Sequence, residues 1–300
     1  MKKKFVIGSA IASTLTASTM TASLALTTQF AKRMLYRDQL NLESCSEWCA
    51  GMNAKKFKIK NHKDMHLQAY MFEKDNAKRT VICLHPFLKS SGDLKETVTL
   101  LQDMFDDANI LLYDANAHGV SDGYIRGFGY RDVFDLMYFN TYVLQKYGED
   151  HRVIVYGQGM GANTMLNAAG LGKLKNVDCL ISEGAFEDVY HYLAYLCQSQ
   201  IKVSQYVSGP ILRHVIKKEM KYDIKKMDTV SMVKKNTIPT AYIHAKNDKD
   251  VPFASVLSLY NKAVSEKFLF PIKDHYLYEL KGKEDEYLSS LYEFVHTYTK

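Results

Sequence analysis

Residues 152–162 read RVIVYGQGMGA, a short apolar run followed at once by alternating glycines. A run of this length is typical of a buried strand, and residues 160–171 have helical spacing. A strand that turns directly into a helix is the frame of a nucleophile elbow, G-x-S-x-G, in which a tight turn lifts the central side chain above the sheet. Gly157 and Gly161 take the flanking positions, where neighbouring backbone leaves no room for a Cβ. The centre of the motif is Gly159, so the nucleophilic hydroxyl is missing.

Short apolar runs alternate with helical stretches from residue 56 onward. This alternation predicts an α/β fold with a mostly parallel central sheet and helices on both of its faces. An antiparallel pair is expected to open the sheet, at residues 57–60 and 67–72. Buried strands are expected at residues 80–84, 109–113, 152–156, 178–181, 240–243 and 268–272. Helices are expected at residues 94–105, 130–147, 160–171, 254–264 and 284–298. One insertion, residues 186–235, lacks a strand pattern and is predicted to form a helical lid.

The beginning of the chain differs from the rest. Three lysines at residues 2–4 precede an uncharged run over residues 5–31, which is the order of an export signal. We therefore expect a signal peptide or signal anchor at 1–31, a helical linker at 32–55 and one α/β domain at 56–300, into which the predicted lid at 186–235 is inserted. The protein body is expected to be membrane-anchored or secreted, outside the cytoplasm. The few scattered cysteines would also suit a reducing compartment, which is the main argument against export.

Composition argues against several partners. The net charge of +6 comes from 39 basic and 33 acidic residues, with no concentrated basic stripe, so no nucleic-acid partner is expected. Cys45 and Cys49 are one helical turn apart but lack the partners of a zinc site, so no metal is expected. The glycines of the elbow lack the G-x-G-x-x-G spacing of a dinucleotide loop, so no cofactor is expected.

Two further loops carry residues that would complete a catalytic site. Asp248 follows the strand at 240–243, where a carboxylate can orient an imidazole. Asp250 is the alternative acid, and the alignment of motifs favours Asp248. His275 follows the last predicted strand and is the candidate general base. The order elbow, acid, histidine along the chain is the order of a nucleophile-elbow triad.

A loop before the elbow supplies a candidate oxyanion hole. The residues after the strand at 80–84 read His85-Pro86-Phe87, and the backbone N–H of Phe87 is one predicted donor. The second predicted donor is the N–H of Met160, directly after the apex of the elbow. A helix that starts at Met160 adds its positive end to this position.

From about residue 56 to the C-terminus, these motifs together resemble the α/β-hydrolase superfamily. The resemblance is to bacterial serine hydrolases of the serine aminopeptidase and prolyl-oligopeptidase-like group, which are often membrane-anchored. It rests on the elbow, the loop YDANAHGVSDG at 113–123, the entry Ile238-Pro239-Thr240 and the loop of His275. It implies that Asp248 and His275 are the triad acid and base and that Gly159 replaces the nucleophilic serine. Pro86 also departs from the family, which usually has glycine after the histidine of the oxyanion loop.

Three functional hypotheses follow from the glycine. The first is a serine-hydrolase homologue with impaired catalysis, which binds a small-molecule or peptide ligand in the cleft under the lid. The second is an active hydrolase of esters or peptides, in which His275 and Asp248 activate a water. The third is that Gly159 is a substitution of a natural serine. Whether the chain is an enzyme therefore stays open at the level of sequence.

Overall fold

The computed structural model describes residues 2–37, 46–61, 63–273, 276–280 and 286–299, which form one large sheet, the helices around it and a separate helical unit. His275, the predicted base, and Cys45 lie outside the described residues. The strands, in chain order, are β1 (Lys55–Lys60), β2 (His66–Phe72), β3 (Arg79–Leu84), β4 (Ala108–Tyr113), β5 (Arg152–Gln158), β6 (Val177–Glu183), β7 (Thr240–Ala245) and β8 (Lys267–Ile272).

These strands form one eight-stranded sheet with the order β1-β2-β4-β3-β5-β6-β7-β8. β2 pairs antiparallel with β1 and with β4, and all pairings from β4 to β8 are parallel. The predicted antiparallel opening pair and the mostly parallel sheet are therefore confirmed. The parallel strands are almost wholly buried up to β7, which explains why they read as continuous apolar runs in the sequence.

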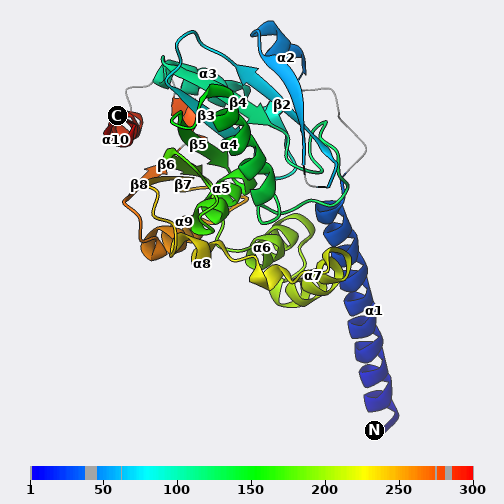
Figure 1. Cartoon of the computed structure of the whole chain (residues 1–300). Coiled ribbons are helices and arrows are strands. Elements are labelled where there is room, and N and C mark those ends of the chain that lie inside the picture. The colour runs from blue at the N-terminus through cyan, green and yellow to red at the C-terminus, as the bar shows by residue number, and fades with distance from the viewer. Residues whose placement is uncertain (1, 38–45, 62, 274–275, 281–285, 300) are drawn as a thin grey trace. The chain divides into compact units, whose positions relative to one another are not determined.

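Helices cover both faces of the sheet (Figure 1). Those of the sheet unit are α2 (Ser46–Gly51), α3 (Lys95–Met104), α4 (Val133–Tyr147), α5 (Met160–Gly170), α8 (Thr229–Val233), α9 (Phe253–Lys262) and α10 (Glu286–Tyr298), with short 3₁₀ turns η1 (Ser91–Leu94) and η3 (Leu277–Leu280). On one face, Val81 and Cys83 of β3 join a core with Leu101 of α3 and Phe294 of α10. Alternate residues of a strand point to opposite faces, so the residues of β3 that alternate with Val81 and Cys83 face α4 and α5, and α9 packs against β7 and β8.

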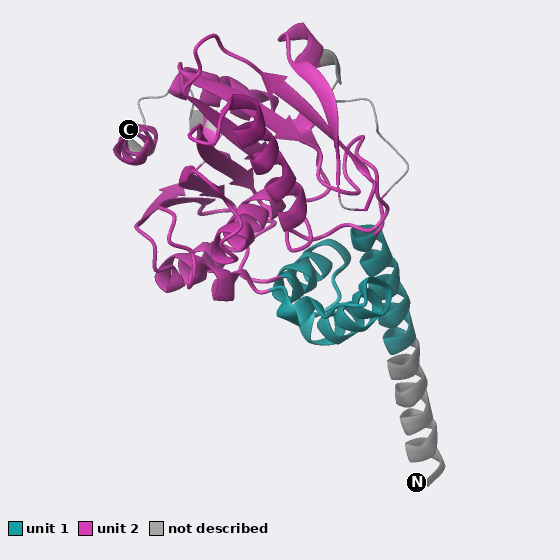
Figure 2. Cartoon of the chain, in the orientation of Figure 1, with its two compact units in different colours: residues 1–35, 189–227 teal, residues 36–188, 228–300 magenta. Residues whose placement is uncertain are grey.

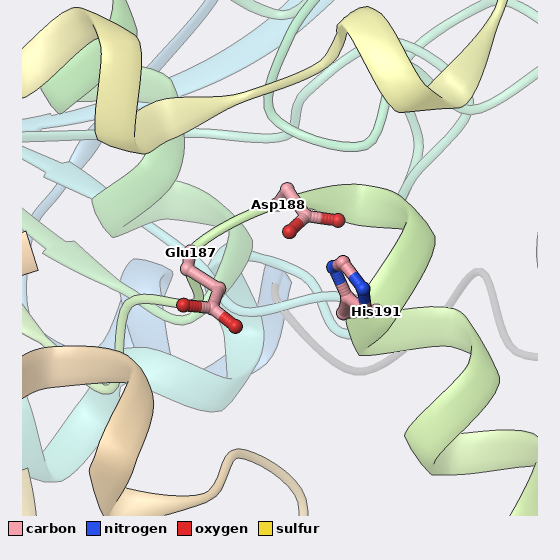
Figure 3. A group of neighbouring side chains, drawn as sticks. All are labelled: Glu187, Asp188 and His191. Carbon is pink, nitrogen blue, oxygen red and sulfur yellow. The ribbon is translucent and has the colours of Figure 1, made fainter. Parts of the chain in front are cut away.

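The chain divides into two compact units (Figure 2). Unit 2 comprises residues 36–188 and 228–300 and contains the whole sheet. Unit 1 comprises residues 1–35 and 189–227, with helices α1 (Lys2–Leu35), α6 (Val189–Ile201) and α7 (Gln205–Met220) and the turn η2 (Ile224–Lys226). Figure 3 shows the side chains of Glu187, Asp188 and His191, where the chain first passes from unit 2 into unit 1.

Unit 1 brings together helices that are far apart in the sequence. The last turns of α1 pack against α6 and α7, and Phe30, Met34 and Leu35 are buried there. The insertion predicted at 186–235 is helical and contains no named strand in its described residues, and its lid role stays a prediction.

Helix α1 runs without a break through the boundary predicted at residue 31. Among the described residues, no helix combines the length with the apolar composition that a bilayer crossing requires. The export and anchoring predicted from residues 1–31 stay predictions.

Candidate functional site

The turn between β5 and α5 has the geometry of an elbow. β5 ends at Gln158, α5 begins at Met160, and Gly159 between them has φ 52° and ψ −115°. This conformation is rare for residues with a side chain and is typical of strained functional turns. The turn is fixed from both sides: Gly159 N donates to Glu183 O at 2.8 Å, and Asn163 N donates to Gly159 O at 3.1 Å. Residue 159 is therefore the apex of the turn.

The three glycines of the elbow differ in the space around them. A Cβ on Gly157 would lie 2.6 Å from Ala162 N, and one on Gly161 would lie 2.6 Å from Leu84 Cβ. Neither position admits a side chain, as the sequence predicts for the flanks of an elbow. A Cβ on Gly159 would meet nothing nearer than Pro86 Cβ, at 3.3 Å. Steric crowding therefore explains the flanking glycines but not the central one.

The predicted oxyanion donors lie beside the apex. Phe87 N is 4.0 Å from the position that a Cβ of residue 159 would take. Met160 is the first residue of α5, and N–H groups in the first turn of a helix have no acceptor within the helix. The arrangement places a backbone N–H from the loop after β3 and a helix N-terminus on the same small region of space. Such an arrangement can stabilise a negatively charged oxygen there.

Asp248 lies close to the elbow and is held firmly. Its Oδ1 accepts hydrogen bonds from Asp250 N at 2.8 Å and Val251 N at 2.9 Å, and its side chain is only 9% exposed. A Cβ on Gly184 would lie 3.9 Å both from Asp248 Oδ2 and from Gly159 N, so the carboxylate lies near the apex, and the same Oδ2 lies 3.6 Å from His244 Nε2. Asp250 is exposed and contributes its backbone to this turn, which favours Asp248 over Asp250 as the acid.

Two other histidines end buried strands and anchor loops. His85 Nε2 accepts from Ala115 N at 3.1 Å, so the proton of a neutral ring is on Nδ1, which lies 2.8 Å from Pro86 O. Burial lowers the pKa of His85, consistent with a neutral ring. His244 is fully buried, and its Nε2 lies 2.9 Å from Val251 O. The His85 ring is bonded to backbone groups, whereas His244 Nε2 also lies 3.6 Å from Asp248 Oδ2, the carboxylate of the candidate acid.

Glu183, which follows the strand predicted at 178–181, is a further carboxylate beside the elbow. It is buried at the end of β6, the strand next to β5. Its Oε2 accepts from the Tyr156 hydroxyl and from Gln158 Nε2, the latter at 3.2 Å. Its Oε1 accepts from Leu277 N at 2.7 Å. The Glu183 carboxylate therefore links Gln158, the residue before the apex, to Leu277 in the segment that follows β8. The only sequence signal was its place directly after a strand.

We expect the Glu183→Ala variant to lose roughly 2 kcal/mol or more of unfolding free energy. The truncation leaves the buried N–H of Leu277 and the buried hydroxyl of Tyr156 without their acceptor, and unmade buried hydrogen bonds are costly. Urea unfolding followed by circular dichroism measures the change. Glu149→Ala, at an exposed glutamate, is the matched control and is expected to stay within about 0.5 kcal/mol of wild type. Equal stability of the two variants would contradict the bridging role.

The loop at 113–123 has a structural role. Asp114 Oδ1 accepts from Ser91 N at 2.8 Å and Ser91 Oγ at 2.6 Å, and its Oδ2 accepts from Val120 N at 2.9 Å. Ser121 Oγ donates to Asp114 O at 2.6 Å. These bonds tie the loop after β4 to the turn η1, so that it forms a rigid border of the loop after β3.

No protein-family model matches the sequence. Among curated proteins, the uncharacterized protein YqkD of Bacillus subtilis (strain 168) is 26% identical over 162 residues. The aligned region covers 54% of this chain and 53% of YqkD, so the chain spans about half the length of this relative.

Solved structures match over most of the chain. The Pyrococcus furiosus esterase Pf2001 has a TM-score of 0.69 at 20% identity and covers 89% of this chain and 99% of its own. Est1E from Butyrivibrio proteoclasticus, with ferulic acid bound, has a TM-score of 0.60 at 16% identity and covers 81% and 99%. The esterase EaEST from Exiguobacterium antarcticum has a TM-score of 0.57 at 15% identity and covers 81% and 100%. At these identities the likeness concerns the fold, and this chain has the α/β-hydrolase fold.

Proposed function

We propose that this protein is a serine-hydrolase homologue that binds an ester or peptide-like small molecule at the elbow without forming an acyl-enzyme. The observation that carries the proposal is Gly159: it lies at the apex of the elbow, its positive φ favours glycine, and an added Cβ would meet no atom nearer than Pro86 Cβ at 3.3 Å. Acyl transfer through a covalent intermediate needs an oxygen or sulfur at this apex. Glycine supplies neither, whereas the donors and the acid around it are kept.

The ligand class follows from the surroundings of the apex and from the structural neighbours. A helix N-terminus and the nearby N–H of Phe87 favour a carbonyl or carboxylate oxygen. Three of the neighbours are esterases, and one of them holds ferulic acid. Aryl esters such as methyl ferulate are therefore the first ligands to test.

Isothermal titration calorimetry of methyl ferulate with the wild-type protein tests the binding role. We expect saturable binding, with the ester recovered intact after the titration, because the chain supplies no acylated intermediate. If the wild type does not bind the ester while Gly159→Ser hydrolyses it, the binding role is contradicted. The arrangement of the other catalytic groups would still be supported.

Hydrolysis by an activated water is the second candidate function. It is favoured by the absence of a side chain at residue 159 and by the nearly buried carboxylate of Asp248 close to the apex. In this case His275 removes a proton from water, and the water attacks the ester carbonyl directly. We expect slow turnover of activated aryl esters without a burst of product, reduced about 10²-fold or more in His275→Ala. Stopped-flow and steady-state assays measure both features. Equal rates for wild type and His275→Ala would exclude this candidate.

A further inference from the structure

Unit 1 is much more basic than the rest of the chain. Its residues, 1–35 and 189–227, include twelve Lys and Arg but only two Asp and Glu, whereas the remaining residues include 27 and 31. The sequence alone does not reveal this concentration of charge, because the two segments of unit 1 are separated by more than 150 residues. A charge asymmetry between two parts of one chain indicates an anionic partner for the basic part.

The basic residues of the second segment gather on one side of α7 and on the turn η2. α7 buries Leu212, Ile216 and Met220 inside unit 1, and residues three or four apart share one face of a helix. The opposite face of α7 is therefore the exposed one. The exposed lysines of this face and of the residues that follow it, which we call the basic face, are Lys217, Lys218, Lys221, Lys225 and Lys226.

Little negative charge balances the basic face. Asp223 accepts from Arg213 Nε at 2.8 Å, and Lys217 Nζ lies 3.9 Å from the same carboxylate. Among the described residues, no carboxylate lies within ion-pairing distance of the other four lysines of the basic face. Lysines in the last turn of a helix stabilise its dipole, which accounts for Lys217 and Lys218 but not for the three that follow the helix.

Unit 1 also exposes apolar side chains. Tyr206, in the first turn of α7, is 93% exposed, and the adjacent Val207 is 46% exposed. In α1, Met20 is 74% exposed and Leu24 is 52% exposed, ahead of Phe30, where the helix enters the core of the unit (Figure 2). A lipid surface accommodates both kinds of group, since its headgroups attract lysines and its interface takes up apolar and aromatic side chains. A nucleic acid would account for the lysines but not for the exposed aliphatic side chains.

We propose that the basic face of unit 1 binds a bilayer surface rich in anionic lipid headgroups. The lysines contact the headgroup phosphates, and the ring of Tyr206 enters the interface. Each lysine close to an anionic surface strengthens binding about fivefold, so the five together supply an attraction that a neutral bilayer lacks. This surface is separate from the anchoring predicted for residues 1–31, and the inference does not depend on the function proposed for the elbow.

Co-sedimentation of the full chain with lipid vesicles tests the proposal. At about 0.1 M salt, we expect vesicles of phosphatidylcholine with about 30% phosphatidylglycerol to bind the wild type about tenfold or more tighter than vesicles of phosphatidylcholine alone. Screening at about 0.5 M salt should reduce this preference several-fold. The variant Lys218→Gln/Lys221→Gln/Lys226→Gln should bind the anionic vesicles about 10²-fold more weakly, because it removes three of the five charges of the basic face.

A matched variant separates the position of the charges from the net charge of the chain. Lys56→Gln/Lys95→Gln/Lys173→Gln removes the same number of charges from exposed positions of unit 2 and should bind the anionic vesicles within about twofold of wild type. Tyr206→Ser should weaken binding about threefold or more through the loss of the ring from the interface. Every position changed is exposed, so all variants should fold, which circular dichroism checks.

Three results would overturn the proposal. They are equal binding of the anionic vesicles by wild type and the triple variant of the basic face, equal losses in the two triple variants, and binding of neutral vesicles as tight as that of anionic ones. The first result would mean that binding comes from another part of the chain, such as residues 1–31. Binding of duplex DNA without binding of anionic vesicles would make the partner a nucleic acid and the lipid proposal wrong.

Discussion

The Gly159→Ser variant is expected to react covalently with a fluorophosphonate probe that leaves the wild-type chain unlabelled. The backbone of residue 159 already has the elbow conformation, with φ 52° and ψ −115°. A serine there directs its hydroxyl from the turn toward the region that Phe87 N and the start of α5 border. Loss of the nucleophile in a serine hydrolase costs on the order of 10⁶ in turnover, so its return should raise reactivity by several orders of magnitude. Intact-mass spectrometry measures the adduct, and peptide mapping must place it on residue 159.

Two local costs limit how reactive the variant becomes. A residue with a Cβ in this conformation carries strain of about 1–3 kcal/mol. The hydrogen bonds from residue 159 N to Glu183 O and from Asn163 N to residue 159 O have to offset this strain. The new Cβ also lies 3.3 Å from Pro86 Cβ, so Pro86 must move by a few tenths of an ångström. The double variant Gly159→Ser/Pro86→Gly removes this contact and should react at least as fast as the single variant.

Matched variants separate the effect of the serine hydroxyl from the effect of the added Cβ. Gly159→Ala adds the Cβ and the strain without an oxygen, so it should remain unlabelled. Adding His275→Ala to Gly159→Ser should slow labelling about 10²-fold or more, because the general base that we propose for the serine is then absent. If the folded Gly159→Ser protein resists the probe both with Pro86 in place and after the Pro86→Gly change, the catalytic frame is not retained.

The elbow could be predicted from sequence because its signal is local. The strand, the turn and the helix are contiguous, and the flanking glycines are required by backbone that packs within a few residues of them or on the adjacent strand. The alignment of motifs ranks Asp248 above Asp250, and its role as the acid stays a prediction. The strands could be predicted from the apolar runs, because a strand that is buried on both faces has few polar residues.

The remaining features depend on contacts between distant segments. Glu183 accepts a hydrogen bond from Leu277, which is 94 residues away, and the sequence around either residue does not predict that bond. Asp132 and Asp135 lie in the first turns of the helix predicted at 130–147, and only the tertiary packing buries them. The grouping of α1 with α6 and α7 likewise joins segments separated by more than 150 residues. Local periodicity carries no information on such pairings.

Gly161→Ala is expected to lower the unfolding free energy by about 3 kcal/mol or more. The added Cβ would lie 2.6 Å from Leu84 Cβ and in closer conflict with Leu84 O, on a strand held between β4 and β5. Leu84 is buried in the sheet and cannot move aside without breaking its ladder, so α5 would have to shift away from β3. Insertion of even one methyl group into packing this tight typically costs about 1–3 kcal/mol, and backbone conflict adds to that cost. Chemical denaturation followed by circular dichroism measures the loss.

The control for this prediction is Gly51→Ala at the end of α2, where an added Cβ meets nothing within 4 Å. Alanine is the better helix former, so this variant should equal wild type or gain a few tenths of a kcal/mol. Gly157→Ala should behave like Gly161→Ala, because its Cβ would lie 2.6 Å from Ala162 N. If Gly161→Ala and Gly51→Ala were equally stable, the close approach of α5 to β3 would be wrong. The close packing at Gly157 and Gly161 would then no longer support an elbow with residue 159 at its apex.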